Sequence, residues 1–273
     1  MTSVSEFNRD RAVISDICVV EALKDGNPDI GALWELCIFL EWDRRQTVDG
    51  IAAWLDKVSG KRILDCACGS GFPALDLIRR GYDVTCSDGS LLMVEHFRRN
   101  SRLLGVSADV SVTEWADLAS SIEKPFDVVM CRGGGSLLYA GTWDEDAAPD
   151  RGAVTGAIDQ FVACLQPGGL VYVDITRAEN LSSAAPQWNH YPPFLVGAHE
   201  VEFNEVVTVD FDRRIRTWQA WLSIDGLTNE FERRSHLLTH EDLVREMESA
   251  GLKNVHHETV SGETYAVFVG TKR

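Results

Sequence analysis

Two features that would assign a chain to a broad class are missing from this sequence, and a third is scarce. No apolar run approaches the ~18 residues of a membrane-spanning helix, and the opening stretch MTSVSEFNRDRAVISD has no apolar segment of the secretory type. Positive charge is scarce, because 26 Lys and Arg stand against 42 Asp and Glu, for a formal net charge of −16. Such a surface repels a phosphate backbone. We therefore predict a cytoplasmic protein that binds neither membranes nor nucleic acid and acts on a small molecule.

Cysteine is present, but without the spacing of a metal site. The seven cysteines are an odd number, and those in predicted strands and helices are expected to be reduced core residues. Cys66 and Cys68 have no second Cys/His pair at zinc spacing nearby. His256 and His257 are neighbours on a predicted strand, so they face opposite ways. We predict that the protein binds no metal.

The order of the predicted elements indicates an α/β fold. Residues 1–60 read as helical, and strands and helices alternate from residue 61 onward, which is typical of a parallel sheet covered on both faces. After residue 176, three strands follow one another without helices, up to about residue 240. The last two strands are joined only by SGE, which is too short for a parallel crossover and requires a hairpin. We therefore predict a mostly parallel sheet whose last strand is reversed, with an antiparallel insertion at about 176–240.

A glycine turn follows the first strand of this alternation. The stretch RILDCACGSGFPALDL reads as a buried strand, a turn and a helix, and its GSGFPA (69–74) satisfies the pattern G-x-G-x-x-G/A. Nicotinamide or flavin dinucleotides and S-adenosylmethionine are both held by such turns. Asp88, at the end of the next strand, suits the ribose hydroxyls of either cofactor. The turn alone leaves both cofactors open.

The charges around the turn distinguish the two cofactors. A dinucleotide brings a pyrophosphate, which favours backbone amides without carboxylates nearby. Here Asp65, Asp88 and Asp117 mark three successive strand ends, and no Lys or Arg lies within residues 63–78. Like charges at ~4–6 Å cost on the order of 1 kcal/mol even when well screened. Because S-adenosylmethionine has a net positive charge, the acidic turn favours it.

The ordered motifs resemble those of class I S-adenosylmethionine-dependent methyltransferases. The similar stretches are ILDCACGSGFPALDL, VTCSDGSLLMVEHF and LQPGGLVYVD. The chain also resembles the glycine/sarcosine N-methyltransferase group and its natural-product relatives, through WELCIFLEWDRRQTVDGIAAWL, TEWADL and FDVVMCRGGGSLLYA. The resemblance implies a Rossmann-like sheet of seven strands with helices on both faces. It also implies a helical lid over 1–60 and a methyltransferase domain over 61–273.

Several residues are predicted to hold the cofactor. Gly69 and Gly71 would let the backbone approach its methionine part, while Asp65 orders the turn. Asp88 would accept the ribose hydroxyls, and Met93 would pack on the adenine unless it is a core residue.

The resemblance adds further cofactor contacts. It implies that Trp115, backbone amides and Asp117 within EWAD (114–117) surround the adenine amino group. It also implies that Arg45, or Arg44 in the neighbouring register, grips the carboxylate, and that the backbone of Cys131 and Arg132 at the fourth strand end holds the ammonium. The relatives usually continue that strand with Gly-Asn-Ser, whereas this chain has GGGS. The complete predicted cofactor set is Arg45, Asp65, Ala67, Gly69, Gly71, Asp88, Gly89, Met93, Trp115, Ala116, Asp117, Cys131 and Arg132.

The methyl acceptor is expected near the loops after the fourth and fifth strands. In relatives that act on amino acids, an arginine near Arg177 binds the substrate carboxylate. The predicted acceptor-binding residues are Ser136, Tyr139, Arg177, His190 and Tyr191, with Trp143 and Trp188 as further wall candidates. His190 and Tyr191 are the candidates for a general base, and no other catalytic residue is assigned.

These residues together predict methyl transfer from S-adenosylmethionine to the nitrogen of a small-molecule amine by in-line displacement. The acceptor would be amino-acid-like or a natural product. Three alternatives stay open: a small-molecule O-methyltransferase of secondary metabolism, an NAD(P)-dependent oxidoreductase, and a cofactor-binding protein without catalysis. The sequence leaves the acceptor and the oligomeric state undecided, although N-terminal lids in the resembled group often meet a neighbouring subunit.

Overall fold

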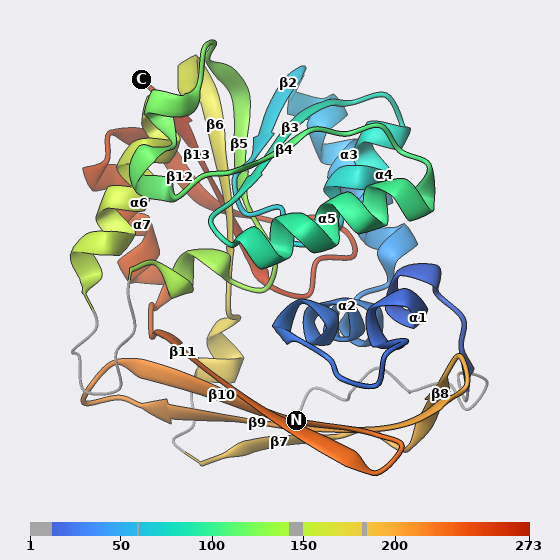
Figure 1. Ribbon diagram of the computed structural model, residues 1–273. Helices are drawn as coiled ribbons and strands as arrows, with labels where there is room; N and C mark the ends of the chain where they lie inside the picture. The colour runs from blue at the N-terminus through green and yellow to red at the C-terminus, as the bar shows by residue number, and fades with distance from the viewer. Residues whose placement is uncertain (1–12, 59, 142–149, 182–184) are drawn as a thin grey trace.

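Two sheets, one lying across the end of the other, organise the computed structural model, which describes residues 13–58, 60–141, 150–181 and 185–273 (Figure 1). The larger sheet has seven strands in the order β12-β13-β6-β5-β2-β3-β4. These strands are β2 (Arg62–Asp65), β3 (Asp83–Asp88), β4 (Val110–Val112), β5 (Phe126–Cys131), β6 (Leu165–Ile175), β12 (Leu252–Glu258) and β13 (Ala266–Lys272).

The direction of the strands follows from the connections between them. Strands β2 to β6 run parallel, and a helix or short helical turns lie on each connection between successive strands. Strand β13 runs antiparallel to both β12 and β6, because the seven residues 259–265 between β12 and β13 form a hairpin. The predicted seven-stranded, mostly parallel sheet with a reversed last strand is therefore confirmed.

Helices cover both faces of the larger sheet. On one face lie α3 (Arg44–Val58), α4 (Ala74–Arg79) and α5 (Leu91–Leu104), and on the other lie α6 (Arg151–Ala163) and α7 (His240–Ser249). Side chains alternate across the sheet, so the central strands carry apolar residues on both faces, whereas the edge strands β4 and β12 are largely exposed.

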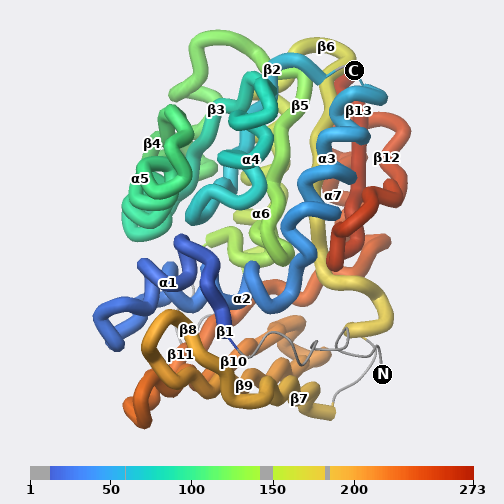
Figure 2. Tube along the Cα trace, turned by 90° about the vertical axis from the view of Figure 1, so that its right-hand side faces the viewer, coloured from blue at the N-terminus to red at the C-terminus, as the bar shows by residue number. Residues whose placement is uncertain are grey.

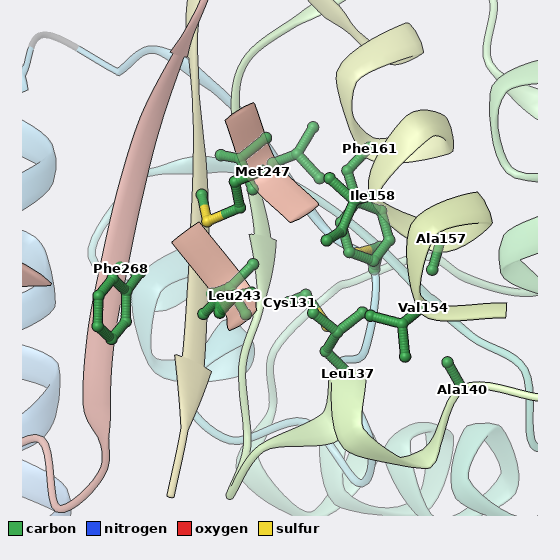
Figure 3. Packing of buried hydrophobic residues seen from close by; sticks show 14 of the residues in the cluster. Cys131, Leu137, Ala140, Val154, Ala157, Ile158, Phe161, Leu243, Met247 and Phe268 are labelled. Carbon is green, nitrogen blue, oxygen red and sulfur yellow. The ribbon is translucent and has the colours of Figure 1, made fainter. Parts of the chain in front are cut away.

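Strand β5 shows this alternation directly. Val128 and Met130 join the cluster under α3, whereas Val129 and Cys131 join the cluster under α6 and α7. Figure 3 shows Cys131 among the side chains of α6 and α7. A continuous apolar strand is therefore what the two-sided burial requires.

The smaller sheet has six strands and is mostly antiparallel. Its order is β1-β8-β9-β10-β11, with β7 paired to β9. The strands are β1 (Val13–Ile14), β7 (Gln187–His190), β8 (Phe194–Val196), β9 (His199–Asp210), β10 (Ile215–Ile224) and β11 (Leu227–His236). The short strands β1, β7 and β8 have no counterpart among the predicted elements. Asp225 and Gly226 join β10 to β11 with φ of 49° and 85°, the left-handed pair that a two-residue hairpin turn needs.

Two helices fill the space between the sheets, as Figure 2 shows. Helices α1 (Ile17–Leu23) and α2 (Ile30–Glu41) pack on the inner face of the smaller sheet. The opposite side of α2 contacts α5, where Glu35 accepts a hydrogen bond of 2.6 Å from Asn100. Burial from two sides explains why IGALWELCIFL is apolar almost all round.

Short helical turns complete the described chain: η2 (Trp115–Asp117), η3 (Ala119–Ser121), η4 (Ser136–Tyr139) and η5 (Ala178–Leu181). Across the described ranges, none of the helices combines the length and the apolar character needed to cross a bilayer.

Candidate active site

A cavity of about 420 Å³ opens between the carboxyl ends of the larger sheet and the inner face of the smaller one. Its lining comes from the loops after β2, β3 and β5, from η2 and η4, and from α2 and β11. Ligands of open α/β sheets bind outside the carboxyl ends of the strands. The cavity therefore lies where the fold predicts a binding site.

The glycine turn forms one side of the cavity. The Gly69 N–H donates to Oδ2 of Asp88 at 2.9 Å, and the Ser90 N–H donates to Oδ1 at 2.9 Å. Gly71 has a φ of +115°, and a Cβ there would lie 2.5 Å from Cδ1 of Leu75. Because a carboxylate oxygen has more than one lone pair, Asp88 retains capacity to accept ligand hydroxyls. Four predicted residues line the cavity here: Ala67, Gly69, Asp88 and Gly89.

Asp65 supports this turn from the protein interior. Its side chain is buried, and its Oδ1 accepts a hydrogen bond of 3.3 Å from the Ala67 N–H. Burial raises the pKa of Asp65 to about 7, with Asp88 and Asp174 adding to the rise, while the Ala67 N–H and Arg132 oppose it. Asp65 is thus a buried carboxyl that orders the turn, and it does not line the cavity.

A second acidic residue and an aromatic side chain form the side of the cavity next to the glycine turn. Glu114 and Trp115 both line the cavity, and a Cβ on Gly89 would lie 2.9 Å from Oε2 of Glu114. The Trp115 indole N–H donates to the Cys66 carbonyl at 2.7 Å, and its ring meets the ring of Phe161 edge-on. The rim near the turn therefore carries two carboxylates, those of Asp88 and Glu114.

Of three further predicted cofactor contacts in this region, one lines the cavity and two do not. Met93 lines the cavity from the first turn of α5, with only 9% of its surface exposed. Ala116 and Asp117 are exposed and do not line the cavity, because η2 turns their side chains away from it. Glu114 was missed by the sequence analysis, although its place beside Trp115 in TEWADL was a signal for it.

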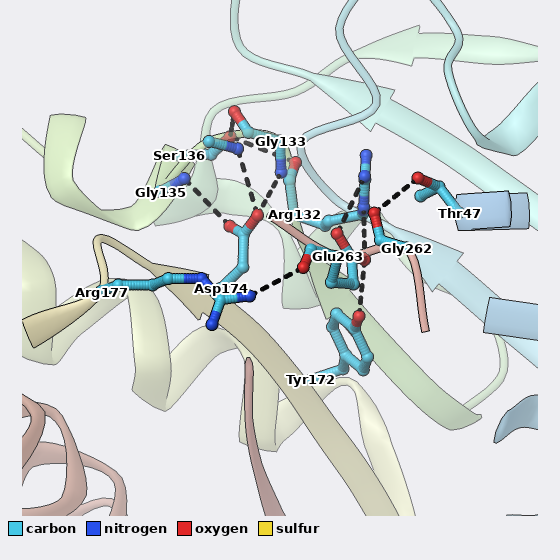
Figure 4. Close-up of polar contacts among 11 residues, drawn as sticks. Thr47, Arg132, Gly133, Gly135, Ser136, Tyr172, Asp174, Arg177, Gly262 and Glu263 are labelled. Atoms are coloured by element: carbon cyan, nitrogen blue, oxygen red, sulfur yellow. Dashed lines mark hydrogen bonds and ion pairs between the residues drawn. The ribbon is translucent and has the colours of Figure 1, made fainter. Parts of the chain in front are cut away.

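The end of β5 holds a buried ion pair. The Arg132 guanidinium donates to both carboxylate oxygens of Glu263, at 2.8 and 3.0 Å, and the Tyr172 hydroxyl donates to Oε1 at 2.7 Å (Figure 4). The guanidinium also lies 5.6 Å from the ring of Trp42 and 5.1 Å from that of Phe72. Burial tends to lower the pKa of Arg132, but the Glu263 carboxylate more than offsets this and raises it. The positive charge of Arg132 is therefore neutralised within the protein.

The GGGS loop is held by one carboxylate at the end of β6. The three N–H groups of residues 133–135 donate to Asp174, at 3.1, 3.1 and 3.0 Å (Figure 4). Burial, and after it the Glu263 carboxylate, raise the pKa of Asp174 to about 6, although Arg132 and the amides of Gly133 and Gly135 oppose the rise. All three glycines have φ between +79° and +123°, so the loop follows a path that other residues adopt only with strain. Ser136 and Tyr139, which follow this loop, line the cavity.

The cavity does not include every predicted cofactor contact. Arg45 is corrected: its side chain is 91% exposed and faces Asp49 one turn along α3, at 3.8 Å, because the first turn of α3 directs it to solvent. The alternative, Arg44, pairs with Asp16 at 3.3 Å and stacks on the ring of Phe72, and it does not line the cavity either. Cys131 is buried in the core just before the cavity-lining Arg132.

The predicted acceptor contacts of the later segments also lie elsewhere. Arg177 donates to the Thr264 and Glu263 carbonyls at 2.6 and 2.9 Å, so it fixes the loop before β13. His190 lies on the outward face of β7, where it stacks on Trp188, because residues two apart in a strand share a face. Tyr191 packs inside the smaller sheet. Trp143 falls outside the described residues.

Some cavity residues were not singled out from the sequence. Trp34 and Ile38 of α2, and Trp42 just after its end, line the cavity at a spacing of four residues, and Trp34 stacks on Trp218 of β10 at 5.4 Å. Their spacing is equally typical of core residues, so only the packing of α2 against the cavity reveals them. Arg233 of β11 also lines the cavity, and no local motif marks it.

Metal ligation has no support from the described part of the chain. No group of three or more His, Cys, Asp or Glu side chains there stands close enough to hold a metal ion.

Comparison with known proteins finds a family match for part of the chain that lines this cavity. Residues 63–169 match the family described as "Methyltransferase domain". A glycine/sarcosine N-methyltransferase of Halorhodospira halochloris is 28% identical over 137 residues, which cover 50% of this chain and 48% of that protein. A ubiquinone biosynthesis O-methyltransferase of Xylella fastidiosa is 28% identical over 116 residues, 42% of each chain. The chain thus spans about half the length of the curated relatives it matches.

Solved structures agree on the fold. An S-adenosylmethionine-dependent methyltransferase from Clostridium acetobutylicum superposes with a TM-score of 0.69 at 15% identity, covering 89% of this chain and 97% of that one. The sugar N-methyltransferase KedS8 from a Streptoalloteichus species gives a TM-score of 0.65 at 19% identity, covering 85% and 88%. At these identities the likeness concerns the fold.

Proposed function

We propose that this chain, which belongs to the class I S-adenosylmethionine-dependent methyltransferases as its motifs predicted, transfers a methyl group from S-adenosylmethionine to the nitrogen of a small-molecule amine. The acceptor is amino-acid-like or a natural product. The observation that carries this proposal is the acidic rim of the cavity, where Asp88 and Glu114 stand beside the glycine turn.

The residues around the turn suit the proposed cofactor. Two carboxylates favour a ligand that brings hydroxyls and cationic groups, and they disfavour a pyrophosphate. Asp88 would hold the ribose hydroxyls, while Met93 and Trp115 would flank the adenine. Arg132, which lines the cavity, already pairs with Glu263, so it offers little net charge to a diphosphate.

The chain's own contribution to the reaction is placement. When bound, S-adenosylmethionine supplies a methyl group on a sulfonium whose leaving group is a neutral thioether, so no acid is needed. The cavity walls then have to align the acceptor with the methyl group at about 3 Å on one axis. Trp34, Trp42 and Tyr139 supply flat apolar surfaces that restrict the acceptor and exclude water.

Nitrogen is favoured over oxygen as the acceptor atom. An amine only has to arrive unprotonated, whereas a phenol or alcohol usually needs a base. None of the described residues that line the cavity is a histidine, and the proposed base His190 lies on the outward face of β7. The names of the glycine/sarcosine relative and of KedS8 support nitrogen, and the Xylella relative keeps O-methylation as the second candidate.

Calorimetry tests the cofactor half of the proposal. We expect the protein to bind S-adenosylmethionine and S-adenosylhomocysteine, and to ignore NAD⁺ and NADPH. The variant Asp88→Asn should weaken S-adenosylhomocysteine binding about 10- to 100-fold, as expected for losing hydrogen bonds to a charged group. Asp83→Asn is the matched control, because Asp83 begins the same strand at its far, exposed end, where it pairs with Arg62 at 3.9 Å.

Transfer of a labelled methyl group tests the acceptor half. Fragmentation of the labelled product should place the methyl group on nitrogen. Label on oxygen would select the second candidate, whereas tight binding of NAD⁺ with no response to S-adenosylhomocysteine would refute both.

A further inference from the structure

We propose that Arg233 binds an acidic group of the acceptor, so that the acceptor is an amine that also carries an anion, in the simplest case a carboxylate. This inference rests on the proposed function and names the acceptor class for the same cavity. It also assigns an acceptor-binding role to β11, a segment outside the motifs of the sequence analysis.

The register of the smaller sheet directs Arg233 inward. Arg233 pairs across the sheet with Trp218, and Trp218 in turn pairs with Val207. Directly opposite residues of neighbouring strands share a face of the sheet. Trp218 is only 4% exposed and stacks on Trp34 of α2, so this row faces the space between the two sheets. Arg233 therefore reaches the cavity from the wall opposite the glycine turn.

The end of β11 is fixed against the cavity wall. His236, three residues beyond Arg233, forms a hydrogen bond of 2.9 Å with the Ala140 carbonyl. This bond joins β11 to η4, whose Ser136 and Tyr139 line the cavity. Arg233 thus stands beside the predicted acceptor side of the cavity.

The two arginines of the cavity differ in their partners. The guanidinium of Arg132 is committed to both oxygens of Glu263. Within the described part of the chain, no ion pair joins a carboxylate to Arg233. A guanidinium matches a carboxylate or phosphate in charge and in fork geometry. Arg233 is therefore a cation of the cavity wall that a ligand anion can pair with.

Opposite charges therefore lie on opposite walls of the cavity. The rim at the turn carries the carboxylates of Asp88 and Glu114, whereas the β11 wall carries Arg233. An acceptor with an anion at one end would be repelled from the rim and attracted to β11. Its amine would then point toward the cofactor end, which is the orientation that transfer requires.

Matched pairs of acceptors test this inference. The panel consists of α-, β- and aromatic amino acids, each as the free acid and as its uncharged carboxamide, assayed with labelled S-adenosylmethionine. Calorimetry on protein loaded with S-adenosylhomocysteine measures binding of the same pairs without turnover. We expect the acids to be preferred, and Arg233→Ala to raise their KM and Kd about 10- to 100-fold while moving those of the carboxamides less than about 2-fold. Arg233→Lys should recover part of the loss, because it keeps the charge but not the fork.

The neighbouring arginine is the control. Arg234 lies on the opposite face of β11 and pairs with Glu232 at 3.2 Å, so Arg234→Ala should change neither KM nor Kd. Equal use of acids and carboxamides, unaltered by Arg233→Ala, would overturn the inference and leave N-methylation standing. A loss of S-adenosylhomocysteine affinity in Arg233→Ala would also overturn it, because Arg233 would then serve the cofactor. Absence of label on every amine, together with no binding of S-adenosylhomocysteine, would instead refute the proposed function itself.

Discussion

The two walls of the cavity are built in different ways. The wall from the larger sheet consists of backbone turns that carboxylates hold in place, as Asp88 holds Gly69 and Asp174 holds residues 133–135. The wall from the smaller sheet and α2 consists of side chains, among them Trp34 and Arg233, that strand register and helix packing bring together. Under the proposed function, the first kind of wall would hold the cofactor, whereas the side chains of the second would contact the acceptor.

The largest effect on stability should come from breaking the buried ion pair beneath the wall that the larger sheet forms. Glu263→Ala removes the partner of Arg132, which is 3% exposed, and leaves its charge uncompensated. We expect a loss of about 3–5 kcal/mol in the free energy of unfolding, measured with urea. Glu258→Ala is the control, because Glu258 pairs with the exposed Lys57 at 3.9 Å and such pairs contribute about 0–1 kcal/mol. Similar losses in the two variants would contradict the assignment of Arg132 and Glu263 as a buried pair.

A pH-dependent effect should come from Asp65, beneath the same wall. Burial raises its pKa from 3.8 to about 7, so the folded protein binds this proton more tightly than the unfolded chain does. The stability due to this group is fully present below about pH 4 and is lost as the pH rises through about 7. Asp65→Asn removes the titration and should therefore be more stable than the parent at about pH 8, by up to about 4 kcal/mol.

The measurement for Asp65 is urea unfolding of the unliganded protein across this pH range. Asp49→Asn, at a position 54% exposed on α3, is the control and should follow the pH profile of the parent. If Asp65→Asn also followed the parent profile between about pH 4 and 8, Asp65 would not hold its proton as proposed.

The smallest effect should come from the second wall and should spare the cofactor. Trp218→Phe keeps a ring opposite Trp34 but removes the indole N–H that donates to the buried Glu205 at 2.6 Å. We expect a loss of about 1–3 kcal/mol in stability for the unsatisfied carboxylate, with an unchanged Kd for S-adenosylhomocysteine. Trp221→Phe, on the outward face of the same strand, should change stability by less than about 0.5 kcal/mol. Weakened S-adenosylhomocysteine binding in Trp218→Phe would show that the two walls are not independent.

Local patterns predicted much of the first wall. The order of strands and helices, the reversed last strand and the glycine turn follow from residues close together in sequence, and the cavity includes Ala67, Gly69, Asp88, Gly89, Met93 and Trp115. Exceptions came where a side chain's direction depends on the turn it occupies. Ala116 and Asp117 lie in the right segment, but η2 leaves them exposed.

The second wall could not be predicted in this way. Arg45 and Arg177 were expected to meet ligands, yet one faces solvent and the other holds backbone carbonyls before β13. Arg233 reaches the cavity instead, because the pairing of β10 with β11 turns it inward. A strand's inward face depends on register with its neighbours, and a shift of one residue would reverse it.

The sequence by itself determined the α/β order, the hairpin that reverses β13 and the acidic glycine turn, because each depends on contacts between near neighbours in the chain. The tertiary structure alone decided that Glu263 neutralises Arg132, that Asp174 holds the glycine loop, and that Arg233 faces the cavity. The first of these contacts spans 131 residues of sequence. Such contacts depend on which elements pack together, and no local spacing specifies that packing.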